Sequence, residues 1–187
     1  MNSLNLQNLS PFQREIELFE KELVGELDLS TLVEKILDKM IQVTHAERGF
    51  VILREKEGSR IALARNMGQE NLPDSPDQIS ASIAGNVMEK GEALLTVDAL
   101  EDERFSVVSS IHHLKLRSIL CLPFMRGPEV LGAIYLDHRG QSGVFQAPLL
   151  HSLKPFAEML GKILSNARRF FEVESDLKAT PSRIDVK

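Results

Sequence analysis

The sequence lacks the features of several common protein classes. Its single cysteine cannot form an internal disulfide bond. No apolar run approaches the roughly 20 residues of a membrane-spanning helix. The first residues, MNSLNLQNLS, have no basic region followed by an apolar block, so they do not resemble a signal peptide. We therefore expect a domain without disulfide bonds or membrane spans, located in the reducing cytoplasm.

Basic charge and catalytic motifs are also scarce. The 187 residues include 22 Lys and Arg against 27 Asp and Glu, giving a net charge of -5, so we expect no direct binding of nucleic acid. Glycine-rich phosphate loops, nucleophile elbows and clusters with metal-ligand spacing do not occur in the sequence. The adjacent His112 and His113 would point about 100° apart on a helix and cannot form an i, i+4 metal pair. We expect neither catalysis nor a bound metal.

The apolar residues that are present alternate between helical and strand periodicity. In the stretch SILCLPFMRGPEVLGAIYLD, residues 118–137, apolar side chains occupy both parities of two runs around a Gly-Pro turn. Such a hairpin is typical of a central strand pair that is covered on both faces. The whole pattern predicts an antiparallel sheet with helices packed on it. Its elements are a helix from Asp28 or Ser30, a hairpin over 48–67, a helix over 80–88, a strand over 93–99, a helical insertion, the hairpin over 118–137 and a long helix after Phe145.

Two residues interrupt these patterns. Gly132 lies inside a predicted strand, where a missing side chain indicates close approach by another group, and we favour a packed helix over a small ligand. Pro155 lies inside the long C-terminal pattern and predicts a kink or a late helix start.

The two ends of the chain predict helices that pair with a second copy. The N-terminal helix carries a narrow stripe of the coiled-coil type, and the C-terminal helix carries two stripes that continue beyond a small sheet. We expect a homodimer. Its contacts would come from Phe12, Ile16, Phe19, Leu23, Ile163 and Phe170. The chain then divides into an N-terminal dimerisation helix (1–26), a main domain with a C-terminal signalling helix (27–172) and a linker to a downstream effector (173–187).

Several segments together resemble a GAF domain. They are LDLSTLVEKILDKMIQVTHAERGFVILRE, DALEDERF, LRSILCLPF, GPEVLGAIYLDHR and FAEMLGKILSNAR, in the order and spacing of that family over residues 27–170. The chain is most similar to the GAF sensor domains of sigma-54-dependent bacterial transcriptional activators. The resemblance implies a GAF/PAS-like α/β fold of the α+β type, with a central antiparallel sheet of five or six strands. Terminal helices would cover one face, and a ligand pocket with lid helices would cover the other.

The chain departs from the motifs of the better-defined GAF subfamilies. Members that bind cyclic nucleotides carry an Asn-Lys pair, a phenylalanine and an Asp-Glu pair, whereas this sequence has Asp137-His138, keeps Phe145 and has Leu149-Leu150. This departure argues against cyclic GMP. Ile111, not cysteine, precedes His112, which argues against a covalent bilin, and one cysteine is too few for a methionine sulfoxide reductase. A non-haem iron or redox sensor built on Asp137 and Cys121 remains an alternative.

Within this resemblance we expect a small-molecule ligand whose identity, like that of any cofactor, the sequence does not define. In the predicted lid, Arg104 or Arg65 would hold an anionic ligand, and Tyr135 or Asp137 would contact its polar groups. The ordinary alternative for the segment around Asp98 is a solvated loop with helix caps. The candidate ligand residues are Arg65, Asp98, Arg104, Cys121, Tyr135 and Asp137.

The sequence thus predicts a regulatory sensor domain that passes a signal through dimeric helices. Its output would be a downstream module such as the AAA+ ATPase of a sigma-54-dependent activator. A ligand-free structural dimerisation module is the alternative from a different class.

Overall fold

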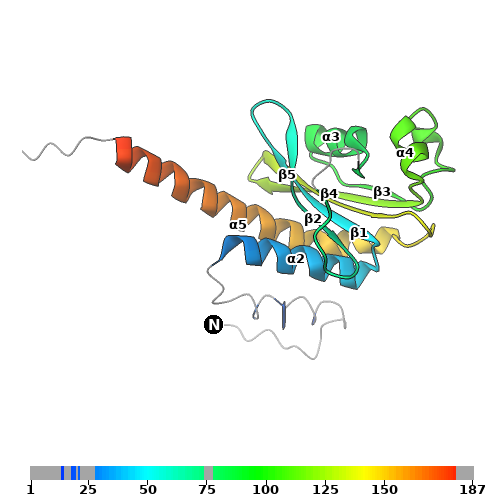
Figure 1. The fold of residues 1–187 in the computed structure, drawn as a ribbon, viewed down its shortest axis with the longest axis horizontal. Helices are drawn as coiled ribbons and strands as arrows, with labels where there is room; N and C mark the ends of the chain where they lie inside the picture. The colour runs from blue at the N-terminus through cyan, green and yellow to red at the C-terminus, as the bar shows by residue number, and fades with distance from the viewer. Residues whose placement is uncertain (1–13, 15–17, 20, 22–27, 74–77, 180–187) are drawn as a thin grey trace, which may run out of the picture.

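The computed structural model describes residues 14, 18–19, 21, 28–73 and 78–179, and side chains up to residue 166. It contains a five-stranded antiparallel sheet between two layers of helices, as Figure 1 shows. This arrangement confirms the predicted α+β fold and the predicted order of elements from residue 28 onward.

The sheet has the strand order β2-β1-β5-β4-β3, and all neighbouring strands are antiparallel. The strong hairpin of the sequence forms β4 and β5 near its middle, and every residue from 131 to 137 is buried. Burial on both faces explains why apolar residues occupy both parities there. The strand bounds are β1 Arg48–Arg54, β2 Ser59–Asn66, β3 Leu94–Thr96, β4 Ser118–Arg126 and β5 Glu129–His138.

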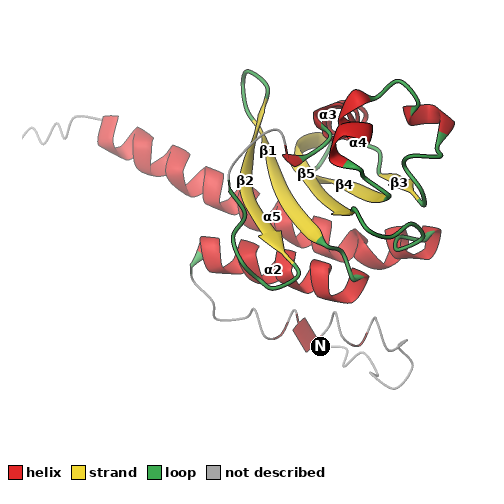
Figure 2. Ribbon diagram, turned by 45° about the vertical axis from the view of Figure 1, so that its right-hand side comes forward, coloured by secondary structure: helices red, strands yellow, loops and turns green. Residues whose placement is uncertain are grey.

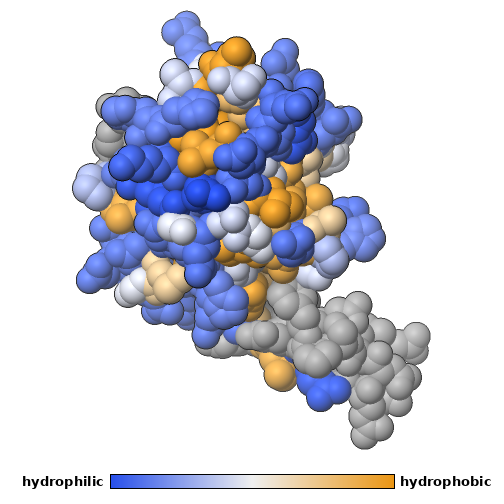
Figure 3. Space-filling view, turned by 90° about the vertical axis from the view of Figure 1, so that its right-hand side faces the viewer, coloured by the Kyte–Doolittle hydropathy of each residue, from blue (hydrophilic) through white to orange (hydrophobic). Residues whose placement is uncertain are grey.

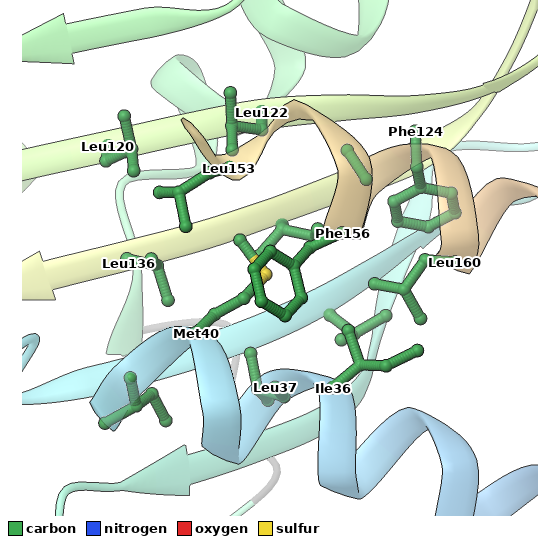
Figure 4. Packing of buried hydrophobic residues seen from close by; sticks show 14 of the residues in the cluster. Ile36, Leu37, Met40, Leu120, Leu122, Phe124, Leu136, Leu153, Phe156 and Leu160 are labelled. Carbon is green, nitrogen blue, oxygen red and sulfur yellow. The ribbon is translucent and has the colours of Figure 1, made fainter. Parts of the chain in front are cut away.

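Two long helices cover one face of the sheet: α2, Leu29–Thr44, and α5, Ala147–Ala179 (Figure 2). Asp28 caps α2 by accepting a hydrogen bond from the backbone N–H of Thr31 at 2.8 Å. In the core, the side chains of Phe156 from α5 and Met40 from α2 belong to one cluster with those of the strands (Figure 4). This layer therefore joins both helices to the sheet through apolar contacts.

Three shorter helices cover the opposite face. They are α3, Ala81–Lys90, the 3-10 helix η3, Glu103–Phe105, and α4, Ser109–Leu114. Gly91 ends α3 in the left-handed region at φ 65°. Glycine adopts that conformation without a steric penalty, which explains why the helix stops there. These helices occupy the place of the predicted lid.

Two interpretations of single residues are corrected by the fold. A side chain at Gly132 would strike the carbonyl oxygen of Ile52 on β1 and the ring of Phe124 on β4, so neighbouring strands approach it, not a helix or a ligand. The helix with Pro155 starts earlier, at Ala147, so a late start is wrong. The same helix reaches Ala179, beyond the expected linker boundary at 172.

The close approach of a helix to the sheet occurs instead at Gly161 of α5. A Cβ there would meet the backbone of Met125 on β4, including its nitrogen at 3.2 Å. Gly161 therefore lets α5 lie directly against the strand.

The dimerisation residues fall into different environments. Phe12, Ile16 and Leu23 lie outside the described residues. Phe19 is buried in the core of its own protomer, with its ring 5.8 Å from that of Phe156, and its role at a dimer seam stays a prediction. Ile163 also packs partly against that core. The side chain of Phe170 lies outside the described part, and its role at a seam stays a prediction.

The surface seen in Figure 3 is largely polar, with separate apolar patches between charged side chains. Val107, next to α4, is the most exposed of the large apolar residues in the described ranges, at 91%. Within those ranges no helix combines the length and the apolar character needed to cross a bilayer.

Candidate functional site

The face of the sheet beneath α3 and α4 carries a layer of packed, mostly apolar side chains. Phe50 and Tyr135 meet edge-on in its centre, with ring centroids 6.0 Å apart and an interplanar angle of 73°. Both are fully buried, as are Ile111 of α4 and Cys121 of β4. The described side chains of this layer therefore pack against one another between the sheet and the helices.

A short polar connection crosses this apolar layer. The hydroxyl oxygen of Tyr135 accepts a long hydrogen bond, 3.5 Å, from the backbone N–H of Ser80, at the start of α3. The hydroxyl groups of Ser80 and Ser110 lie 2.9 Å apart, which joins α3 to α4. Ser80 and Tyr135 are fully buried. The sheet and both lid helices therefore meet through polar groups at one place.

Burial strongly affects the ionisation of Tyr135. Transfer of its phenolate out of water, and the nearby charge of Asp137, raise the pKa of Tyr135 well above its ordinary value. Its phenol therefore stays protonated in the folded protein and can donate a hydrogen bond to a ligand.

An ion pair lies at the edge of the same layer. Asp137 on β5 accepts two hydrogen bonds from Arg48 on β1, at 2.9 Å to Nε and 2.5 Å to Nη2. Arg48 also donates to the carbonyl oxygen of Gln78, ahead of α3, at 3.0 Å. Burial raises the pKa of Asp137 to about 6, although Arg48 opposes this shift. The pair thus fixes the segment before α3 to the sheet.

These residues do not fit the iron alternative. The carboxylate of Asp137 is already bonded to Arg48, and burial raises the pKa of the Cys121 thiol, which disfavours the thiolate that a metal needs. Among the described residues, no three His, Cys, Asp or Glu side chains are grouped as a metal site would require. We therefore derive no metal chemistry for this site.

The remaining three candidates are not gathered around Tyr135. Arg65 lies on the opposite face of the sheet, where it donates to Asp38 of α2 at 2.9 and 2.7 Å. Asp98 accepts from Arg117 at 3.0 Å.

Arg104, the third of these candidates, is exposed and pairs with Asp102, its neighbour in the same turn, at 2.6 Å. The hydrogen bonds from Arg104 lower the pKa of Asp102 to about 2.

Sequence reasoning missed Arg48, Ser80 and Ser110 as site residues. Ser80 was expected at a helix start, but nothing in the local pattern connected it with Tyr135. For Arg48 a signal existed, because it begins the first strand and Asp137 is the next-to-last residue of the last strand. Their direct pairing across β1 and β5 depends on strand order, which a local pattern does not provide.

The fold and this site together define an antiparallel-sheet domain with a helical lid. A family model described as GAF domain matches residues 26–165. Among curated proteins, the dual 3′,5′-cyclic-AMP and -GMP phosphodiesterase 11A of Takifugu rubripes is 27% identical over 168 residues, covering 80% of this chain and 18% of that protein. The dual 3′,5′-cyclic-AMP and -GMP phosphodiesterase 11 of Drosophila melanogaster is 22% identical over 183 residues, covering 89% of this chain and 13% of that protein. The chain thus spans less than a fifth of these relatives.

Solved structures show the same fold. The GAF domain of an Acinetobacter phosphoenolpyruvate-protein phosphotransferase has a TM-score of 0.66 at 14% identity, covering 88% of this chain and 99% of its own. The A. aeolicus nlh2 GAF domain in an inactive state has a TM-score of 0.61 at 17% identity, covering 83% and 96%. The chain belongs to the GAF family. GAF domains are regulatory domains that sense small molecules, and they often form dimers.

Proposed function

We propose that this chain is the sensor part of a signalling protein and binds a small molecule between the sheet and the helices α3 and α4. The observation that carries the proposal is the contact of Tyr135, Ser80 and Ser110 within an otherwise apolar layer. Ligand sites are typically apolar with a few convergent polar groups. A ligand would replace the contact between the two serines and bond to Tyr135.

A movement that opens the lid would be transmitted to α5 through β4. The methyl end of the Met125 side chain lies near Gly91, which ends α3, while the Met125 backbone lies against Gly161 of α5. A shift of α3 would therefore move Met125, whose backbone contact with Gly161 sets the position of α5. In a homodimer, α5 would carry this shift to the following module, for which we propose the AAA+ ATPase of a sigma-54-dependent bacterial transcriptional activator.

The names of the relatives make cyclic AMP and cyclic GMP the first compounds to test. The N-terminal end of α3, beside Ser80, would favour an anionic group such as their phosphate. The sequence change at Leu149-Leu150 argues against cyclic GMP, so other small molecules belong in the same screen.

The test uses Tyr135 as a built-in reporter. The chain has one tyrosine and no tryptophan, so intrinsic fluorescence reports on this site alone. A ligand should change the emission in a saturable manner, and Ser110→Val should weaken its binding about ten-fold through loss of one hydrogen bond. Ser109→Val, at the adjacent exposed position, is the matched control. Native mass spectrometry of the purified protein would identify a molecule that stays bound.

A ligand-free dimerisation module is the second candidate, favoured by the packing of the described buried side chains against one another. It predicts unchanged Tyr135 emission with every compound, no co-purifying molecule and a dimer that persists under all these conditions. That combination would replace the sensor proposal.

A further inference from the structure

A cavity lies away from the layer beneath α3 and α4. It has a volume of about 520 Å³ and runs along the edge of β4, between the first turns of α5 and the connection from α3 to β3. This volume is within the usual range for small-molecule sites, about 300–1,000 Å³. The lining residues are Gly91, Ala93, Leu122, Pro123, Met125, Gly127, Leu150, Lys154, Ala157 and Glu158.

The groove exists because β3 is short. β3 pairs with Ile119–Cys121, so from Leu122 onward β4 has β5 on one side and no paired strand of the described chain on the other. An extended peptide would be a poor occupant of this edge. Pro123 has no N–H to donate, and α5 covers the backbone of Met125 at Gly161. These two features favour a compact molecule over an added strand.

The wall chemistry defines the type of molecule. Leu122, Leu150 and Ala157 supply an apolar surface, and Lys154 and Glu158 stand at the rim with their charged atoms 3.9 Å apart. Their side chains are 72% and 57% exposed, so this ion pair contributes little to stability. A ligand can therefore pair with either charged group in place of the other.

The choice between the two charges follows from the reach of the side chains. Lys154 has a longer, flexible apolar stem than Glu158, so it can lie along the apolar wall and bring its ammonium group over the groove. An anionic group is therefore favoured on the Lys154 side of the groove.

We propose that this groove is a second, regulatory ligand site, and that it takes a small molecule with an apolar body and one anionic group such as a carboxylate. The apolar body would lie against Leu122 and Ala157, and the anionic group would pair with Lys154. The groove touches both Gly91 at the end of α3 and the N-terminal half of α5. A bound molecule would therefore contact both the lid and the long helix. The proposal for this groove does not depend on the function proposed for the layer beneath α3.

Methyl NMR of protein labelled at the methionine methyl groups distinguishes the two sites. Met125 lines the groove, whereas Met88 belongs to the layer beneath α3. The probe is 2-naphthoate, an apolar ring system with one carboxylate, and 2-naphthamide is its uncharged counterpart. We expect 2-naphthoate to shift the Met125 signal saturably while Met88 stays in place. Lys154→Gln, or use of the amide, should weaken binding about five-fold.

Two variants complete the experiment. Ala93→Phe places a ring in the groove from an exposed position and should abolish the Met125 response. Lys56→Gln, an exposed change in the turn between β1 and β2, should leave it unchanged. The proposal is overturned if 2-naphthoate leaves Met125 unshifted, if Ala93→Phe does not reduce the response, or if Met88 responds instead. None of these outcomes alters the Tyr135 test of the first site.

Discussion

The contact between α5 and β4 predicts opposite effects for the same substitution in two helices. Gly161 and Gly85 both lie inside helices, where replacing glycine with alanine stabilises by about 0.5–1 kcal/mol when there is space. A Cβ at Gly85 would have no neighbour within 4 Å. Gly85→Ala should therefore raise the free energy of unfolding by about that amount.

At Gly161 the steric cost exceeds this gain. The added Cβ would overlap the carbonyl oxygen of Met125 and lie 3.3 Å from its carbonyl carbon. These are backbone atoms of a strand paired with β5, so they cannot rotate away as a side chain could. The helix would have to move outward, and Phe156 and Leu160 would lose contacts. Overpacking of this kind costs about 1–3 kcal/mol, so Gly161→Ala should lower the free energy of unfolding by about 1–2 kcal/mol net.

Urea unfolding followed by circular dichroism measures both changes. The two variants and the parent must be compared at one protein concentration, because self-association of any kind changes apparent stability with concentration. If Gly161→Ala stabilises the protein as much as Gly85→Ala does, α5 does not approach β4 as closely as described.

Three further predictions concern buried groups. Because burial raises the pKa of Tyr135, the folded state should lose stability as pH rises above about 10. Phenolate absorbance should then appear only with unfolding. Tyr135→Phe should remove this dependence of stability on pH. The pKa of Asp137 is raised from 3.8 to about 6, so between these values the free energy of unfolding should fall by up to about 3 kcal/mol with rising pH, relative to Asp137→Asn. A flat difference in paired urea titrations would contradict this. Phe19→Ala should lower the free energy of unfolding by about 3 kcal/mol, measured by thermal or urea unfolding, because Phe19 packs on Phe156. An unchanged free energy of unfolding would instead favour a role for Phe19 at the dimer seam.

The parts of the fold that the sequence predicted correctly depend on local chemistry. The helix start at Asp28 follows from a side chain that can bond to the next free amides, and the end of α3 from a glycine that tolerates positive φ. The central position of β4 and β5 follows from apolar residues on both parities. Each of these signals lies within a few residues of the feature that it predicts.

The features that local patterns did not predict concern partners that are distant in the sequence. Gly132 correctly indicated a close approach, but the approaching group is Ile52 on β1, which depends on strand order. Phe19 has coiled-coil spacing, yet α2 and α5 of the same chain offer it an apolar surface. Arg65 was expected near the ligand, but strand parity places it toward Asp38 on α2. Periodicity identifies a face without identifying what covers it.

The position of Met125 connects the two candidate sites with the long helix. Residues before it alternate strictly, so Cys121 faces the layer beneath α3, while Leu122 and Phe124 face α5. The pairing shifts at this point, because Phe124 lies opposite Gly132 and Met125 opposite Val130, which leaves Leu131 as an extra residue in β5. Met125 keeps the parity of Cys121, so its side chain points toward the end of α3, while its backbone meets Gly161. Because backbone contacts at Gly161 leave no space for adjustment, movement of β4 at this residue must displace α5. We therefore propose Met125 as the residue through which a change in either proposed ligand site would reach α5.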